Sequence, residues 1–209
     1  MRQLLRICSA TTALCMILIL FSGCLQRSKA PYQVDRFILD YPSPVFSGLQ
    51  ISNESIRVDR FSVAQAYNTT AMVYRPAAFR LDSYTGSRWS IHPADMINDL
   101  LVRDLRSARF LAQVFPYQSD ERVRYTLDGF IDQFCEYDEG PLSTAVLSIN
   151  VILFDQQAGQ SSGRFKLQKT YRYSNRISEK TAEALAKGMT KNVEDFSKDL
   201  IQDLSSLFR

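Results

Sequence analysis

The stretch STAVLSINVILFD, residues 143–155, decides the fold of this 209-residue chain. Its side chains alternate between two sides, as in a β-strand, and both sides are largely apolar. One side holds Leu147, Ile149, Val151 and Leu153, and the other holds Val146, Ile152 and Phe154. A strand of this composition is typical of a position inside a sheet with both faces covered. We therefore expect residues 143–155 to form a central strand that is buried on both faces.

A second strand follows after a loop rich in turn residues. The loop QQAGQSSG (156–163) leads into FKLQKTYRYS (165–174), in which apolar and polar side chains alternate cleanly. Two such runs joined by a short turn-forming loop predict a β-hairpin. Its apolar side holds Phe165, Leu167, Tyr171 and Tyr173.

Further strands are predicted earlier in the chain. They cover residues 37–41, 56–63, 71–76, 78–84 and 123–137. The alternation changes phase near Asp59-Arg60, which indicates a β-bulge or bend. Gly129 lies inside the last of these strands and indicates a kink or a close approach of another part of the chain.

Two helices are predicted from apolar stripes with helical spacing. The first covers HPADMINDLLVRDLRSARFLAQVF (92–115), starts at Pro93 and ends before Pro116. The second runs from near residue 179 to near 208, with Ser178 as its N-cap. Its stripe holds Leu185, Met189, Val193, Phe196, Leu200, Leu204 and Leu207.

The order of these elements predicts one α/β domain with a mixed β-sheet and two main helices, in the order β-β-β-α-β-β-β-α. The β-then-α pattern occurs twice, which suggests an internal duplication that periodicity alone does not establish. We expect this domain to span residues 34–209.

The N-terminus has the features of a lipoprotein signal peptide. Arg2 and Arg6 precede a short apolar run, TTALCMILILF, which is too short to span a bilayer as a helix. Ser22-Gly23-Cys24 then resembles the bacterial lipobox, although Phe21 replaces its usual leucine. We expect residues 1–23 to be a signal peptide, Cys24 to be lipidated, and residues 24–33 to form a membrane tether. An ordinary signal peptide followed by a free cysteine is the alternative.

The charge of the chain argues against nucleic-acid binding, and the cysteine of the mature domain is expected to be a packing residue. Removal of residues 1–23 takes away two arginines, which leaves 23 basic and 22 acidic side chains. A chain so close to neutral lacks the basic character of a nucleic-acid-binding protein. The mature domain keeps one cysteine, Cys135, in an apolar neighbourhood, where a thiol packs as a small hydrophobic group.

Few residues qualify as functional sites. Trp89 is a candidate interface anchor, although packing against the sheet is the favoured interpretation. The end of the C-terminal stripe, with Leu200, Leu204 and Leu207, is a candidate surface for a neighbouring subunit, and again packing on the sheet is favoured.

The sequence indicates no catalytic, metal or cofactor site. His92 is the only histidine, which is too few for a histidine-rich zinc site. We expect it simply to flank Pro93 at the start of the helix. We expect the acidic run at 136–139 to form a solvated turn, and cation binding is the alternative. No G-x-x-x-x-G-K-[ST] phosphate-binding loop is present.

Several of these features together resemble a known family. Tyr74-Arg75-Pro76, Tyr84, Arg88-Trp89 and Pro93 precede the helical run DMINDLLVRDLRSARFLAQVF, and a lipobox and a C-terminal amphipathic helix lie at the two ends. This arrangement is similar to that of the ABC-type transport auxiliary lipoproteins of the PqiC type. The resemblance covers nearly the whole mature chain and is strongest over residues 55–115.

The resemblance implies a non-enzymatic protein that is anchored in the outer membrane and faces the periplasm. Its partner would be an MCE-domain protein of an ABC lipid transporter, which it would dock onto or cap. Some relatives form rings, so a homo-oligomer is expected to be compatible with the fold. Leu25 after Cys24, in place of aspartate, favours the outer membrane over the inner membrane.

Two other functions stay open from the sequence alone. The first is a structural or secretion-assembly lipoprotein of the envelope with no role in lipid transport. The second is a periplasmic hydrolase that uses His92, although no G-x-S-x-G motif supports it.

Overall fold

One long strand organises the whole domain. In the computed structural model, which describes residues 33–140, 142–158 and 164–208, β7 (Tyr125–Glu139) has neighbours along both of its edges. On one edge it pairs antiparallel with β8 (Leu142–Asp155), which in turn pairs antiparallel with β9 (Phe165–Ile177). The predicted hairpin of residues 143–174 and the central position of its first strand are thus confirmed.

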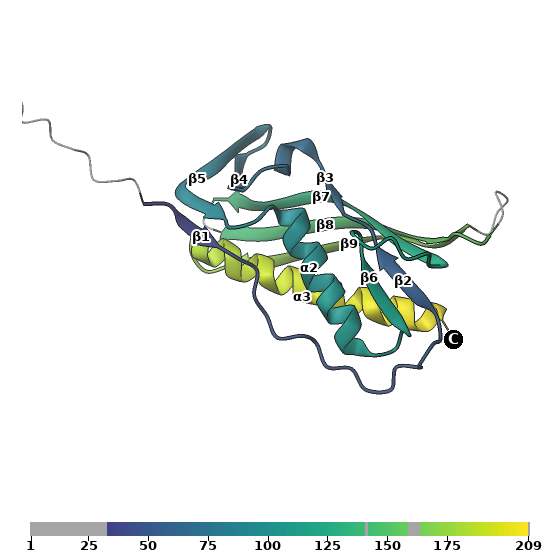
Figure 1. The fold of residues 1–209 in the computed structure, drawn as a ribbon. Coiled ribbons are helices and arrows are strands. Elements are labelled where there is room, and N and C mark those ends of the chain that lie inside the picture. The colour runs from purple at the N-terminus through teal and green to yellow at the C-terminus, as the bar shows by residue number, and fades with distance from the viewer. Residues whose placement is uncertain (1–32, 141, 159–163, 209) are drawn as a thin grey trace, which may run out of the picture. The chain divides into compact units, whose positions relative to one another are not determined.

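The other edge of β7 is shared by two groups of short strands, which we call the two wings. The first wing consists of β2 (Ser55–Val58) and β6 (Gln113–Pro116), which are parallel to each other and to β7. The second wing consists of β4 (Ala71–Ala77), β5 (Arg80–Trp89) and β1 (Asp35–Phe37). Between them, β3 (Ser62–Val63) also pairs with β7. Figure 1 shows this branching, which gives the mixed sheet that the sequence predicts.

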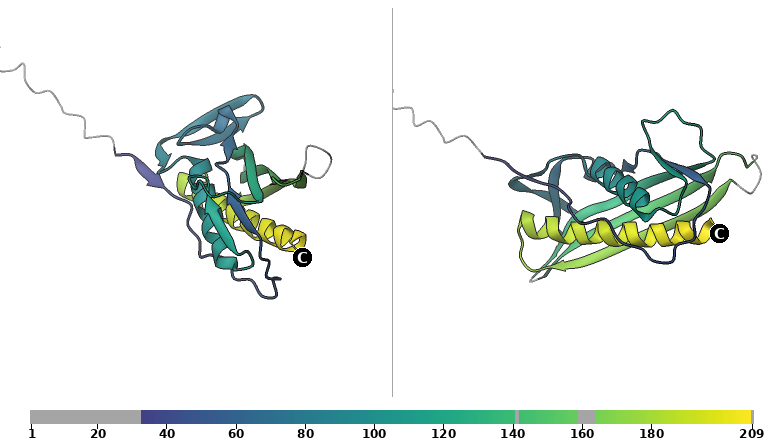
Figure 2. Two further views of the ribbon diagram at one scale, coloured as in Figure 1. Left: turned by 45° about the vertical axis from the view of Figure 1, so that its right-hand side comes forward. Right: turned by 60° about the horizontal axis from the view of Figure 1, so that its bottom comes forward.

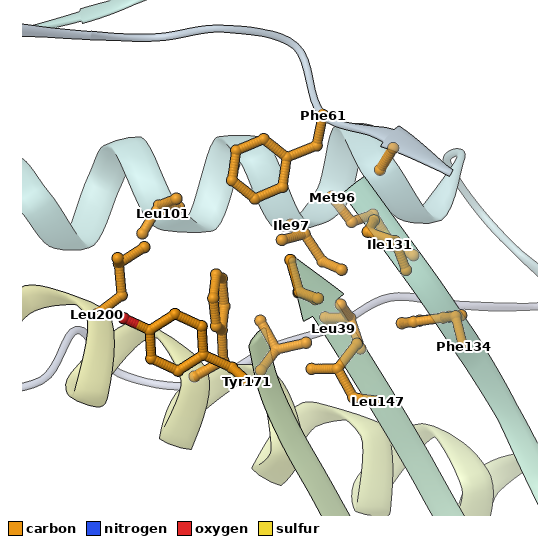
Figure 3. Packing of buried hydrophobic residues seen from close by; sticks show 14 of the residues in the cluster. Leu39, Phe61, Met96, Ile97, Leu101, Ile131, Phe134, Leu147, Tyr171 and Leu200 are labelled. Atoms are coloured by element: carbon orange, nitrogen blue, oxygen red, sulfur yellow. The ribbon is translucent and has the colours of Figure 1, made fainter. Parts of the chain in front are cut away.

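Two helices cover one side of the long strands. They are α2 (Pro93–Ala108) and α3 (Ala182–Leu207), and a short 3₁₀-helix, η2 (Gln65–Tyr67), follows β3. Figure 2 shows α3 running along the sheet. Figure 3 shows Leu200 of α3 close to Leu101 of α2 and Tyr171 of β9, so the main core lies between the helices and the sheet.

The start of α3 differs from the prediction. The N-cap is Thr181, whose Oγ1 atom accepts a hydrogen bond from the backbone N–H of Ala184 at 3.2 Å. Ser178 lies upstream of the helix and does not cap it. A threonine at this position satisfies one of the free N–H groups of the first turn.

The end of α2 is also earlier than predicted. The helix ends at Ala108, and Arg109 adopts the left-handed conformation with φ 53°. The residues expected to continue the helix to 115 instead form β6 beside β2. The guanidinium of Arg106 donates two hydrogen bonds to the carbonyl of Val114, at 2.9 and 3.0 Å, and so ties β6 back to the helix.

The predicted first strand is shorter than its alternation suggests. β1 ends at Phe37, and Leu39 and Tyr41 are buried in irregular chain. The Tyr41 hydroxyl donates to the fully buried carboxylate of Asp104 at 2.8 Å, and the hydroxyl of Ser197 donates to the same oxygen at 2.7 Å. Burial, reinforced by the charge of Asp104, raises the pKa of Tyr41. These bonds join the N-terminal segment, α2 and α3.

The predicted bulge and the predicted close approach at Gly129 are both confirmed. Between the pairs Val58↔Leu127 and Ser62↔Phe130, four steps along the chain oppose three steps along β7. This extra residue lets Phe61 place its ring over Gly129, where a Cβ atom would lie 2.5 Å from the ring. Only glycine fits at this position of β7.

Candidate functional site

The side of the long strands opposite the helices is partly exposed. Side chains of β8 that point toward α3, such as Leu147 and Ile149, are fully buried, whereas Val146 and Ile152 on the other side are partly exposed. The prediction that residues 143–155 are buried on both faces is therefore wrong for the second face. No helix of the described chain covers that side along β8 and β9.

We call this surface the open sheet face and define it by the register of β7, β8 and β9. Its members point away from α3 and occupy opposing or diagonal positions on the three strands. They are Asp128, Phe130, Asp132, Val146, Asn150, Ile152, Phe154, Gln168, Thr170, Arg172 and Arg176.

A shallow hollow lies near the centre of the open sheet face. It has a volume of about 240 Å³, and its lining includes Phe130, Asn150 and Ile152. Phe130 is 42% exposed, which is high for a phenylalanine on a strand. The Asn150 amide donates to the hydroxyl of Thr170 at 3.3 Å, and the Ser148 hydroxyl donates to Asp132 at 3.4 Å. Cross-strand bonds therefore hold the polar groups around the hollow in place.

Charge changes sign across the open sheet face. β7 contributes Asp128 and Asp132 on one side, and β9 contributes Arg172 and Arg176 on the other. Val146 and Ile152 of β8 lie between these two rows, and Phe130 lies within the acidic row on β7. An apolar centre with polar and charged surroundings is the usual composition of a protein–protein interface.

The structure places three of the four predicted interface residues in the core. Trp89 is 1% exposed and its ring lies 5.3 Å from that of Phe134, so it fixes the second wing to β7. Leu200 and Leu204 are fully buried. These three residues pack inside the domain, which is the interpretation favoured from the sequence. Leu207, at the end of α3, is 43% exposed.

The predicted mature chain has two cysteines, of which the structure describes Cys135. Cys24 lies outside the described residues. Cys135 is buried, and its thiol donates to the Tyr67 hydroxyl at 3.7 Å. Burial raises the pKa of the Cys135 thiol to about 11, as expected for a packing group.

The acidic run at 136–139 is not a solvated turn. The whole run belongs to β7, and Glu136 is 1% exposed. The Tyr84 hydroxyl donates to Glu136 at 2.6 Å, and burial followed by this hydrogen bond raises the pKa of Tyr84. Asp138 forms an ion pair with Lys180. The carboxylates therefore connect β7 to the second wing and to the start of α3, and sequence alternation alone gave no signal of this.

His92 has the role expected from its position. It is the N-cap residue of α2, directly before Pro93. Among residues 33–140, 142–158 and 164–208, no group of three His, Cys, Asp or Glu side chains is arranged to hold a metal ion. In the same part of the chain, no helix is long and apolar enough to cross a membrane.

A comparison with protein families shows to which family the chain belongs. A family model described as ABC-type transport auxiliary lipoprotein component matches residues 39–200. The chain belongs to this family. The match covers α2 completely, α3 as far as Leu200, and every long strand, so the resemblance to this family noted in the sequence is confirmed over residues 39–200.

Solved structures share the fold of this auxiliary lipoprotein. A crystal structure of protein XCC0632 from Xanthomonas campestris is similar with a TM-score of 0.74 and 18% identity, covering 83% of this chain and 96% of that chain. Hypothetical protein CT253 from Chlamydia trachomatis is similar with a TM-score of 0.55 and 8% identity, covering 75% and 98%. At these identities the likeness concerns the fold alone. None of the curated proteins matches the chain.

Proposed function

We propose that this protein is a non-enzymatic accessory of an MCE/ABC-type lipid transport system, held in the outer membrane by a lipid on Cys24. Its role is to dock onto or cap the periplasmic MCE assembly. The observation that carries the proposal is the match of residues 39–200 to the transport auxiliary family.

The lipid anchor rests on the sequence before the domain. Ser22-Gly23-Cys24 supplies the small residues and the thiol that lipidation requires, and Leu25 favours the outer membrane. Several acyl chains on one cysteine hold a protein stably, whereas a single chain does so only marginally. Replacement of Cys24 by serine is therefore expected to release the protein from the membrane or to block its processing, with the fold unchanged.

The open sheet face is the surface that we assign to docking. Phe130 and Ile152 give it an apolar centre, and the rows of carboxylates and guanidinium groups give it a defined charge pattern. A sheet whose strands are held by continuous backbone pairing can bind a protein surface with little rearrangement, which lowers the entropic cost of association. The partner should present apolar side chains at its centre and acidic side chains opposite β9.

Photo-crosslinking tests the docking surface directly. A photoreactive phenylalanine analogue is placed at Phe130 in the full-length lipidated protein, and in a control at Val45, which is almost fully exposed but lies in the chain segment before β2. After irradiation in cells, the protein is purified in mild detergent and its crosslinked partners are identified by mass spectrometry. We expect an MCE-domain protein to be crosslinked from Phe130 and not from Val45.

A substitution provides the matching loss of function. Ile152→Asp places a charge at the apolar centre of the open sheet face and should reduce recovery of the MCE-domain protein at least about tenfold. Equal recovery in this variant would contradict docking through this surface. Crosslinks between two copies of the chain would assign the surface to a homo-oligomer, and recovery of secretion or envelope-assembly proteins would favour the alternative function.

A further inference from the structure

The tip of the β4–β5 hairpin combines two unfavourable features in one residue. Ala77 pairs with Arg80, so Ala78 and Phe79 form a two-residue turn. Phe79 has φ 65°, in the left-handed region that turns normally fill with glycine or asparagine. Its side chain is also fully exposed. Neither the backbone nor the ring of Phe79 gains stability from this position in the isolated domain.

The β4–β5 hairpin that carries Phe79 is held to β7 by strand pairing and by a side-chain hydrogen bond. Tyr74 and Arg75 of β4 pair with Glu136 and Tyr137 of β7, and the Arg75 guanidinium donates to the Tyr137 hydroxyl at 2.6 Å. Figure 1 shows the hairpin projecting from the domain on the side away from α3. The tip is thus a fixed projection that ends in an exposed aromatic ring.

Apolar residues lie next to Phe79. Ala77 and Ala78 are exposed, and Leu81 is about half exposed. The basic residue beside the ring is Arg80, which also forms an ion pair with Asp82 at 3.3 Å. An exposed aromatic ring with apolar neighbours and an adjacent guanidinium group suits the boundary between acyl chains and headgroups of a membrane.

We propose that the β4–β5 tip inserts the Phe79 ring into the surface of the membrane that carries the lipid anchor. This inference rests on the anchor at Cys24 in the proposed function. The anchor would supply the first membrane contact and the tip the second, so the domain would be oriented on the bilayer. The effective concentration set by the tether makes even a weak second contact significant.

The chain length permits both contacts at once. From Cys24 to Asp35 the chain can span up to roughly 36–40 Å when extended. Asp35 pairs with Ser87, and Ser87 lies seven residues along β5 from Arg80 at the tip, which is at most about 25 Å. The reach of the tether therefore exceeds the distance between its entry into the wing and the tip.

Fluorescence quenching by brominated lipids tests the insertion. Phe79→Trp is compared with Ile51→Trp, which places an indole at an exposed position outside the wing. Both full-length lipidated proteins are reconstituted into vesicles of phosphatidylethanolamine and phosphatidylglycerol with brominated acyl chains. Trp89 is buried in both and provides the same background. We expect the added indole to be quenched at least about twofold at position 79 and not at position 51.

A second reporter and a flotation assay complete the test. Leu81→Trp should be quenched in the same way but more weakly, and it reports on the tip if Phe79→Trp does not fold. Vesicles that float with protein but leave both tip reporters unquenched would overturn the insertion and leave the anchor standing. Failure of the unsubstituted protein to float would overturn the anchor and the insertion with it. Protection of the tip reporters by a co-purified protein, without lipid quenching, would assign the tip to a protein partner.

Discussion

Both faces of β8 carry apolar side chains, but these side chains meet different environments. Leu147, Ile149 and Val151 face the helices and are fully buried, while Val146 and Ile152 on the open sheet face stay partly exposed. The pattern of a strand reports which side chains are apolar. Whether a face is covered depends on segments far away in the chain, here α2 and α3.

This difference separates the face that stabilises the domain from the face that we propose for docking. The covered face holds the core and its buried polar groups, so substitutions there should lower the free energy of unfolding. The open sheet face carries apolar groups that are only partly buried, so substitutions there should affect stability less. The predictions below test this division, and Trp89 serves as reporter because it is the only tryptophan and is buried.

The largest effect is expected at the buried carboxylate on the covered side. Asp104→Ala removes the acceptor of the Tyr41 and Ser197 hydroxyls and leaves both buried donors without their partner. We expect the free energy of unfolding to fall by about 3–5 kcal/mol. Urea unfolding followed by Trp89 fluorescence measures this loss. Asp99→Ala, at an exposed position of the same helix, is the control, and an equal loss there would contradict the role of the network.

The second prediction compares neighbouring residues of β8. Leu147→Ala leaves a cavity under α3 and should cost about 3 kcal/mol, whereas Val146→Ala on the open sheet face should cost less than about 1 kcal/mol. The same urea titration gives both values. Similar losses in the two variants would mean that the open face is as tightly packed as the covered face, which would break the comparison.

A smaller effect is expected where Phe61 lies over Gly129. Gly129→Ala places a Cβ atom 2.5 Å from the ring and should destabilise the domain by about 1–3 kcal/mol through overpacking. In a Phe61→Leu background the same substitution should cost less, because the ring is gone. A double-mutant cycle measures this coupling, and strictly additive losses would show that the contact does not limit residue 129.

The last prediction concerns Cys135, which is buried although it lies on the same side of the sheet as the open sheet face. Cys135 pairs with Val146 of β8, and Tyr67 of η2 covers its thiol. With the thiol pKa raised to about 11, the thiolate fraction at neutral pH is roughly a hundredfold below that of an ordinary cysteine. Alkylation by iodoacetamide, quantified on the peptide that contains Cys135, should therefore be slow at pH 7 and fast in urea. Rapid labelling of the folded protein would show that η2 does not protect this end of the sheet.

Local patterns predicted much of the fold correctly. The β8–β9 hairpin, the bulge after β2, the restriction at Gly129 and the long stripe of α3 all follow from properties of residues close together in sequence. Errors occurred where local signals compete with distant contacts. The end of α2 depends on β6 pairing with β2, and the position of Ser178 alone did not indicate that Thr181 caps α3.

The sequence by itself determined the class of fold, the family and the candidate lipid anchor, because these depend on composition, periodicity and short motifs. Only the tertiary structure decided which apolar residues are available to a partner. It buried Trp89, Leu200 and Leu204 between distant elements, and it left Phe130 and Phe79 exposed. The physical reason is that burial is a property of the neighbours that a side chain meets, and most of these neighbours lie far away along the chain.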